Sequence, residues 1–335
     1  MNLRQIPKVE LHRHLELSLR HSTIRELAKA AGVKLETQSD FNKKYLITEP
    51  MNDLEAVLSK FLDTQKLLSS EEIIERISFE ACEDAYNEGI RILELRYAPT
   101  FLVMDHPHLD FQKAHDAVVR GCQRAESELG MAVGLISIIQ RILSVDVGKE
   151  VVDFTIANKN SFVGLDLADN EVGFDSKPFA PLFEKAHSEG LGITVHSGEA
   201  DVPKAPRYVR DAIDYLGAQR IGHGLQIYRD KEMMDYVIEK GVVLELCPTS
   251  NLLTNAVKSL DEHPFRKLME YGVATTINSD DPGIFNIDLT NEYQVLADHQ
   301  NFGEQDFQHC NDIAAAASFI AFNKKQKHWP RPIKK

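Results

Sequence analysis

The sequence predicts an α/β fold, a (β/α)8 TIM barrel with a helical insertion after the first strand. Eight short apolar segments alternate along the chain with longer amphipathic segments, most of which end at a glycine. Near-continuous apolar strands that alternate with helices are typical of a parallel sheet covered by helices, and eight such units suffice to close a barrel. An open, doubly wound sheet is the alternative. It is disfavoured because no glycine-rich phosphate loop follows any of the predicted strands.

The eight predicted strands are short apolar segments bounded by polar residues or glycine. In chain order they span residues 8–15, 89–97, 132–140, 162–168, 192–199, 220–227, 242–251 and 274–281. The first of them, KVELHRHL, carries two histidines one residue apart. Because side chains alternate along a strand, we expect His12 and His14 to share one face, and Leu11, Arg13 and Leu15 to share the other.

Helical periodicity predicts the elements between the strands. Four clear segments end at a glycine, the residue that favours the left-handed conformation after a helix, and they span 71–89, 114–130, 179–190 and 231–241. Two more, 22–32 and 53–68, lie in the insertion 20–75, which we expect to cap the barrel mouth as a lid. After the last strand we expect helices at 291–299 and 309–327 and an irregular tail over 326–335, all within one domain of residues 1–335.

Composition and charge exclude several classes of protein. The formal net charge of −13 disfavours nucleic acid as a partner, since that would require a basic surface. The N-terminal segment lacks the apolar core of a signal peptide, and the longest apolar run, residues 313–322, is too short to span a membrane. We therefore expect a cytoplasmic protein without a membrane partner. The cysteines form no CxxC pair and are expected to be reduced and buried; they are Cys82, Cys122, Cys247 and Cys310.

Polar and ionisable side chains gather at the predicted C-terminal ends of the strands, where active sites of this barrel form. They are His12, His14, Asp166, Asp169, His196, Glu199, His223, Ser250, Asn251, Asp280 and Asp281. Taken singly, each has an ordinary structural explanation, such as a histidine bonded to a carbonyl or an aspartate that caps a helix. Taken together they do not, because buried charges and imidazoles that face one space are costly unless they are paired or bind a metal.

A divalent metal ion is the common partner that this set of residues predicts. Imidazoles with one carboxylate suit zinc better than magnesium or calcium, so we expect one zinc ion per chain, bound by His12, His14, His196 and Asp280. Glu199, His223 and Asp281 then remain, and a closed structural zinc site would have no use for them. His223 could orient or deprotonate a water molecule, and Glu199 could hold a proton for a nitrogen. The expected chemistry is hydrolysis at a nitrogen-bearing carbon.

Five motifs carry a resemblance to a known family. VELHRHLE, TVHSGE, IGHG, CPTSN and NSDDP occur in this order over roughly residues 6 to 325, and the chain resembles the adenosine deaminase family of the amidohydrolase superfamily. The resemblance implies zinc-dependent deamination of adenosine and 2′-deoxyadenosine to inosine and 2′-deoxyinosine, with release of ammonia, in purine salvage. It implies the same four zinc ligands. By this resemblance Glu199 would protonate purine N1, His223 would position the attacking hydroxide at C6, and Asp281 would contact N7.

The chain departs from the family pattern at two positions. The family usually has glycine after the acidic residue of the first motif, whereas Leu17 follows Glu16 here. Family members usually read LAGDE, with the glycine amide facing purine N3, whereas Asp169 stands in LADNE. The resemblance therefore gives Glu16, Asp169 and Asp281 as the substrate-binding residues of an altered pocket. Adenine or a 5′-modified adenosine is the alternative substrate.

Three further alternatives follow from the same residues. A nucleotide substrate is disfavoured because no basic cluster lies near the strand ends, although Arg20, Arg96 and Arg141 could each reach a phosphate. A binuclear amidohydrolase would require a lysine at the end of the fourth strand, and GLDLADNE contains none. A catalytically silent metal-binding barrel would not need the acid and base groups beside the metal. The sequence carries no indication of oligomeric state.

Overall fold

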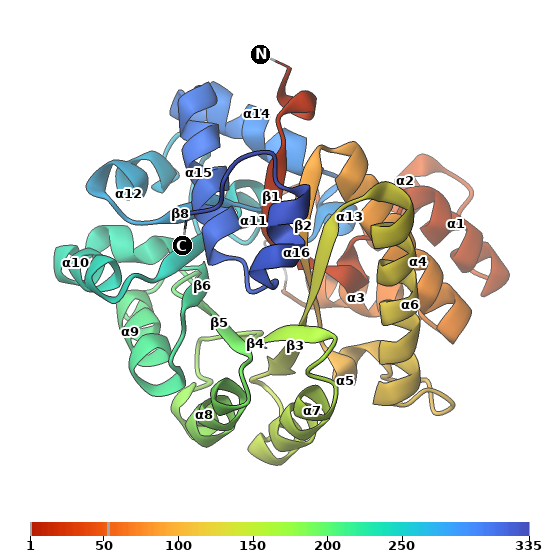
Figure 1. Ribbon diagram of the computed structural model, residues 1–335. Coiled ribbons are helices and arrows are strands. Elements are labelled where there is room, and N and C mark those ends of the chain that lie inside the picture. Colours follow the sequence, from red (N-terminus) through yellow and green to blue (C-terminus); the bar gives the residue numbers. More distant parts are fainter. Residues whose placement is uncertain (1, 52–53, 335) are drawn as a thin grey trace.

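Eight parallel strands form one sheet around which the helices are arranged, as Figure 1 shows. The structure is a computed structural model that describes the backbone of residues 2–51 and 54–334 and the side chains of residues 2–51 and 59–334. Neighbouring strands follow in chain order: β1 (Lys8–His14), β2 (Ile90–Tyr97), β3 (Ala132–Gln140), β4 (Phe162–Ala168), β5 (Gly192–Ser197), β6 (Arg220–His223), β7 (Val243–Leu246) and β8 (Thr275–Ile277). The predicted (β/α)8 TIM barrel is confirmed.

The barrel closes where the segment after β8 meets β1. The backbone N–H of His14 donates to the carbonyl of Asp280 at 2.9 Å, and the N–H of Asp280 donates to the carbonyl of His12 at 3.0 Å. Nearer the start of β1, the N–H of Leu11 donates to Oδ1 of Asn278 at 3.0 Å. Closure of the barrel therefore places His12 and His14 beside Asp280, so three of the four predicted metal ligands are neighbours.

The helices occupy the connections that the sequence predicts, and the described residues also contain four short 3-10 turns. The α-helices are α1 (His21–Ala30), α2 (Gln38–Tyr45), α3 (Leu54–Gln65), α4 (Glu71–Asn87), α5 (Pro99–Leu102), α6 (Phe111–Leu129), α7 (Val145–Ala157), α8 (Ala180–Ser188), α9 (Ala205–Leu216), α10 (Lys231–Lys240), α11 (Pro248–Leu253), α12 (Phe265–Tyr271), α13 (Pro282–Phe285), α14 (Leu289–Gln300), α15 (Glu304–Ala317) and α16 (Phe322–His328). The 3-10 turns are η1 (Leu3–Gln5), η2 (Leu15–Leu17), η3 (Lys177–Phe179) and η4 (Leu225–Arg229). Gly130 and Gly241 end α6 and α10 in the left-handed conformation, as expected.

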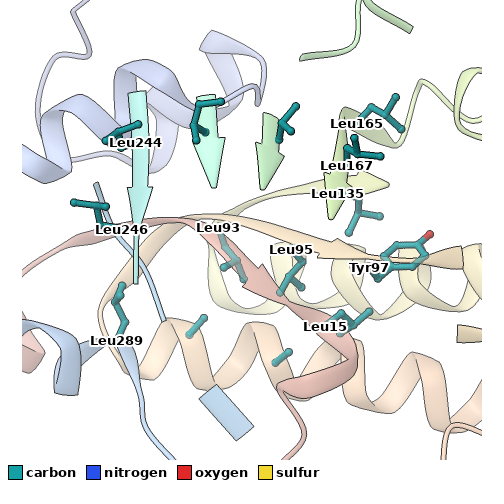
Figure 2. Close-up of a cluster of buried hydrophobic side chains, with 14 of the residues drawn as sticks. Leu15, Leu93, Leu95, Tyr97, Leu135, Leu165, Leu167, Leu244, Leu246 and Leu289 are labelled. Atoms are coloured by element: carbon teal, nitrogen blue, oxygen red, sulfur yellow. The ribbon is translucent and has the colours of Figure 1, made fainter. Parts of the chain in front are cut away.

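The alternation of side chains along β2 separates an apolar outer layer from a polar interior. Leu93, Leu95 and Tyr97 are buried in the main hydrophobic cluster between strands and helices (Figure 2). Arg96, which lies between Leu95 and Tyr97 in the sequence, is also fully buried, but its guanidinium bonds to Asp166 of β4 and to Glu245 of β7. A strand that is buried on both faces usually has apolar side chains throughout. Arg96, Asp166 and Glu245 are exceptions, and their contacts across the barrel identify the face of each strand that points inward.

The end of the barrel opposite the strand C-termini is closed by the segment between α15 and α16. Phe319 fills the space beside Gly192, where a Cβ atom would meet its ring at 2.3 Å. Glu94 of β2 accepts hydrogen bonds from the Ser318 hydroxyl and from the Phe319 N–H at 2.7 and 2.6 Å. These contacts draw the chain out of helical geometry over residues 318–321. The single helix expected at 309–327 is therefore wrong.

The ends of several other elements differ from the prediction. The tail expected to be irregular from 326 is helical up to His328, and the strands expected to end at 199, 227, 251 and 281 end at 197, 223, 246 and 277. Most of the extra residues belong to the loops and short turns that carry the polar site residues. In β1 the register shifts between Glu10 and Arg13, and Leu11 packs in a different hydrophobic cluster from Leu15, so the expected shared face is wrong for Leu11.

The insertion expected at 20–75 contains α1, α2 and α3. Asp53, the first residue of the helix expected at 53–68, lies outside the described residues. A small apolar cluster joins the insertion to the strand-end segments; it contains Leu17, Ile47, Met51, Phe61, Leu253, Ile284, Phe285 and Ile287. Backbone hydrogen bonds from Ile47 to Ile284 and from Met51 to Leu253, both 2.8 Å, fix the same contact.

All four cysteines are buried and free, as expected. Within the part of the chain that the structure describes, none of the helices combines the length and the apolar character that crossing a membrane requires.

Candidate active site

The four predicted metal ligands converge at the C-terminal end of the barrel. Nε2 of His12 and Nε2 of His14 lie 3.1 and 3.2 Å from Oδ1 of Asp280, and Nε2 of His14 lies 3.3 Å from Nε2 of His196. His12 and Asp280 are buried, while His14 and His196 keep 15% and 12% of their side chains exposed toward the mouth. The exposed part of the cluster therefore belongs mainly to His14 and His196.

Two buried carboxylates hold the outer nitrogens of these rings. Oε2 of Glu245 lies 2.8 Å from Nδ1 of His12, and Oδ2 of Asp166 lies 2.9 Å from Nδ1 of His196. Because a carboxylate is an acceptor, each Nδ1 must carry the proton, which leaves the Nε2 lone pair facing the centre. Arg96 donates to both carboxylates at 2.7 Å, so one guanidinium fixes the orientation of two rings.

Electrostatics keeps these groups in the protonation states that a metal requires. Burial lowers the pKa of His196 to about 3, against the opposing effect of Asp166, so its ring is neutral near pH 7. Among the described residues, Nε2 of His12 is buried without a hydrogen-bond partner. Lone pairs and a carboxylate that face one another in this way fit a divalent cation, and three imidazoles with one carboxylate fit zinc.

Glu199 and His223 lie on one side of this centre. His223 ends β6 with a left-handed φ of 61°, and its Nε2 lies 3.9 Å from Oδ2 of Asp280 and 3.7 Å from Oε2 of Glu199. Asp280 has a similar φ of 63°, which is rare outside glycine and typical of functional positions. Thr254 donates to Oε1 of Glu199 at 2.8 Å, which leaves Oε2 directed toward His223.

A buried carboxylate that the sequence analysis did not single out positions Glu199. Glu171 accepts three hydrogen bonds from consecutive backbone N–H groups, those of Gly198, Glu199 and Ala200, at 2.7, 2.9 and 2.7 Å. The turn that carries Glu199 is therefore anchored from the loop after β4. Glu171 belongs to the LADNE segment, so the sequence shows that it follows a predicted strand. The sequence does not show its partners, because they lie 27 to 29 residues away.

Three further polar residues surround His223 and Asp280. Ser250 donates to Oδ2 of Asp280 at 2.7 Å. Asn251 lies 3.1 Å from Nδ1 of His223, and His263 lies 3.1 Å from Asn251 in turn. Ser250 and Asn251 were expected at a strand end without an assigned role, and His263 was not considered.

Asp281 and Glu16 are buried carboxyl groups that face the site with unused polar atoms. Oδ1 of Asp281 and Oε2 of Glu16 have no hydrogen-bond partner within the described part of the chain. Burial, together with Asp280, Glu16 and Glu199, raises the pKa of Asp281 well above its usual value, and burial raises the pKa of Glu16 to about 8. Glu16 is held by the N–H of Ala98, which donates to its Oε1 at 2.7 Å. Glu16 therefore carries a proton near pH 7 and can donate to an acceptor, and burial favours the protonated form of Asp281 as well.

Asp169 is exposed at the rim, at the end of β4, with a left-handed φ of 83°. Gln140 donates to its Oδ2 at 3.2 Å, and Thr100 donates to Gln140 at 2.8 Å, so the ends of three neighbouring strands are linked. The conformation is one that glycine adopts readily and that aspartate tolerates better than most residues.

The three arginines considered as phosphate ligands are engaged elsewhere. Arg96 lies inside the barrel between two carboxylates, and Arg141 is buried and donates to the carbonyls of Leu167, Ala168 and His196. Arg20 forms ion pairs with Glu83 and Asp84 on α4. Arg96 and Arg141 are buried among these acceptors, so the expectation that they could reach a phosphate is wrong. Arg20 is paired but partly exposed, and for it the expectation stays a prediction.

The arrangement combines a metal-binding centre, a carboxyl group that can exchange a proton, an imidazole beside it and protonated carboxyl donors. Such a set is suited to adding water to a carbon that bears nitrogen, because it can protonate the nitrogen while it holds the water.

Comparisons with known proteins agree with this chemistry. The family model described as adenosine deaminase matches residues 7–330. The chain is 36% identical over 333 residues to an adenosine deaminase of Clostridium perfringens, and the match covers 98% of each chain. Its fold is similar to that of an adenine deaminase from Arthrobacter aurescens, with a TM-score of 0.86, 26% identity and 96% coverage of both chains. It is equally similar to a zinc-bound amidohydrolase from Burkholderia ambifaria, with a TM-score of 0.86, 25% identity and coverage of 97% and 88%.

Proposed function

Because the chain belongs to the adenosine deaminase family, we propose that it deaminates adenosine and 2′-deoxyadenosine hydrolytically to inosine and 2′-deoxyinosine, with release of ammonia. The observation that carries the proposal is the convergence of His12, His14, His196 and Asp280 beside the facing pair Glu199 and His223. In a cell this reaction would serve purine salvage.

The residues present fit one zinc ion per chain, held by His12, His14, His196 and Asp280. The bound zinc would supply Lewis-acid chemistry that makes water nucleophilic near neutral pH. In support of this identity, a related amidohydrolase structure contains zinc, and the donor set here is the one zinc prefers.

The remaining side chains divide the work at the purine ring. Glu199, whose Oε2 faces the centre, would transfer a proton to N1 of the purine, and this makes C6 more electrophilic. His223 would hold the attacking oxygen through Nε2. Asp281 would donate to N7, and its burial and raised pKa support a protonated carboxyl group for that contact. As the water oxygen bonds to C6, one of its protons would return to Glu199 and the other would go to the amino group. The C6–N bond then breaks, ammonia leaves, and the product keeps the proton at N1.

The sugar end of the pocket supports a nucleoside over free adenine. Glu16 has one buried oxygen without a partner, and a ribose hydroxyl would satisfy it. Asp169 would lie near the rim of the bound nucleoside, on the side of the base. A nucleotide is disfavoured because Arg20, Arg96 and Arg141 are already paired and Asp169 adds a negative charge at the mouth.

The insertion 20–75 is proposed to cover this mouth as a lid within a single domain. The backbone contacts from Ile47 to Ile284 and from Met51 to Leu253 support the proposal, because both partners lie in segments that follow strands β7 and β8.

A substrate panel tests the proposed function. Ammonia release would be measured with zinc-loaded protein on adenosine, 2′-deoxyadenosine, adenine, 5′-methylthioadenosine, AMP, guanosine and cytidine at equal concentration. We expect the two nucleosides to give the highest kcat/KM, and guanosine and cytidine to be lower by roughly 10⁴-fold, because they leave buried polar groups unpaired. A lack of reaction with every aminopurine would reject the proposal.

Adenine is the second candidate substrate, since a structurally similar protein is an adenine deaminase. If free adenine has the highest kcat/KM, the role given to Glu16 is wrong while the chemistry at C6 stands. If 5′-methylthioadenosine is preferred, the contact of Glu16 with the ribose stands, and the pocket must accept an apolar group at the 5′ position.

A further inference from the structure

A chain of buried hydrogen bonds runs from a backbone amide to the outer nitrogen of His223. The N–H of Phe265 donates to Nδ1 of His263 at 3.1 Å. Nε2 of His263 lies 3.1 Å from Oδ1 of Asn251, and Nδ2 of Asn251 lies 3.1 Å from Nδ1 of His223. All four residues are at most 3% exposed, so water does not supply alternative partners.

The direction of every bond in this chain follows from its first member. A backbone N–H is always a donor, so Nδ1 of His263 must accept and cannot carry a proton. The proton of the neutral His263 ring is then on Nε2, which donates to Oδ1 of Asn251. The amide of Asn251 is thereby oriented with its NH2 group toward His223, and Nδ1 of His223 must accept.

The opposite arrangement places donors against each other. If His223 carried its proton on Nδ1, Asn251 would have to turn its oxygen toward His223 and its NH2 group toward His263. Nδ1 of His263 would then carry the proton and face the N–H of Phe265. Burial lowers the pKa of His263 to about 3, so a doubly protonated ring is also excluded near pH 7, and an unmatched buried donor costs roughly 1–3 kcal/mol.

We propose that His263 is a positioning residue that acts through Asn251 to place the proton of His223 on Nε2. His223 then offers an N–H to the space between Glu199 and Asp280, and it acts as a hydrogen-bond donor to the attacking oxygen and not as a proton acceptor. The role of His223 toward the attacking oxygen rests on the proposed function, whereas the location of its proton does not. Of the two roles open to His223, orienting or deprotonating water, the relay selects the first.

The location of the proton can be measured without turnover. Long-range ¹H–¹⁵N spectra of zinc-loaded protein with ¹⁵N-labelled histidines distinguish protonated from bare ring nitrogens, and His223→Gln identifies the signals of His223 by their loss. We expect a bare Nδ1 and a protonated Nε2 on both His223 and His263. A proton on Nδ1 of His223 would overturn the proposal, whether or not adenosine is a substrate.

Variants of His263 test the positioning role. His263→Phe removes the donor to Asn251, so its amide can turn either way, and we expect His223 to become a mixture of its two neutral tautomers. We expect kcat to fall about 10-fold or more, with KM and zinc content little changed. His263→Gln places an amide where Nε2 stood and should restore most of the lost kcat. The control is His299→Phe, because His299 is exposed and pairs only with Asp261 in the described chain. An unchanged His223 spectrum in His263→Phe would overturn the proposal, as would equal losses of kcat in the Phe and Gln variants.

Discussion

Oε2 of Glu199 lies 3.7 Å from Nε2 of His223, and the two side chains face each other across the space that the metal ligands border. The distance is too long for a hydrogen bond, so the two groups do not bind each other directly. Glu199 comes from the turn after β5, and His223 from the last residue of β6. The pair therefore depends on two neighbouring strands and on the contacts that hold their ends.

Replacing Glu199 by Gln removes the proton donor without changing the shape of the side chain. We expect Glu199→Gln to keep its zinc and its stability and to lose at least roughly 10²-fold in kcat, because a positioned general acid contributes about that much. Ammonia release and metal analysis on the same sample provide the measurement. Glu239→Gln, at an exposed position on α10, is the matched control. Loss of zinc in parallel with activity would instead place Glu199 among the ligands.

Glu171 acts on Glu199 through the backbone of the intervening turn. Glu171→Gln keeps one acceptor oxygen for the three N–H groups that the carboxylate now binds, so the turn carrying Glu199 should move. We expect kcat to fall by about 10-fold to 100-fold, since small displacements of catalytic groups have effects of that size. Zinc binding should persist. Full activity in this variant would show that the turn keeps its position without Glu171.

The charge of Asp169 can be separated from its size. Asp169→Asn removes the charge, and Asp169→Gly removes the whole side chain from a position whose φ of 83° suits glycine. If the charge repels phosphate at the mouth, both variants should raise kcat/KM for AMP relative to adenosine several-fold, as measured by ammonia release with each substrate. A rise in the glycine variant alone would attribute the effect to crowding. No rise in either would remove Asp169 from substrate selection.

A buried glutamate on α14, Glu292, predicts a pH dependence of stability. Burial raises the pKa of Glu292 from 4.5 to about 7, while the N–H of Thr249 donates to its Oε2 at 2.9 Å. Between these values the folded protein binds more protons than the unfolded chain, so the contribution of Glu292 is fully present below pH 4.5 and is lost as pH rises to 7. The loss amounts to at most about 3 kcal/mol.

Urea unfolding at pH 5 and pH 7.5 measures this contribution. Glu292→Gln cannot ionise and keeps an acceptor for Thr249. The free energy of unfolding of the variant minus that of the wild type should therefore increase as pH rises. Glu239→Gln serves again as the control at an exposed site. The same pH dependence in wild type and Glu292→Gln would show that Glu292 does not titrate in this window.

The strand-end rule predicted His12, His14, His196 and Asp280 because each follows a recognisable apolar strand, and a barrel brings such ends together. It could not predict Arg96 between Asp166 and Glu245, since those contacts cross the barrel and depend on which face of each strand points inward. Glu171 and His263 were missed for a similar reason. Each acts on a partner in another loop, and no local pattern records that contact.

Element boundaries failed where tertiary contacts override local preference. The apolar, alanine-rich run at 313–322 has helical periodicity, yet Glu94 draws Ser318 and Phe319 out of the helix. In β1 the strict alternation of side chains is interrupted between Glu10 and Arg13, and Leu11 lies in the cluster that contains Val9. The period of a strand predicts faces only as long as its register is regular.

Titration of the metal-depleted protein with zinc tests the central claim most directly. The chain would be stripped with a chelator at mildly acidic pH, where protonation of the histidines weakens binding, and then returned to neutral pH with increasing zinc. The ultraviolet change from adenosine to inosine would be followed at each point. The account predicts no deamination without metal, a linear rise up to one zinc per chain and a plateau beyond it. Deamination by the metal-free chain, or a requirement for two ions, would contradict it.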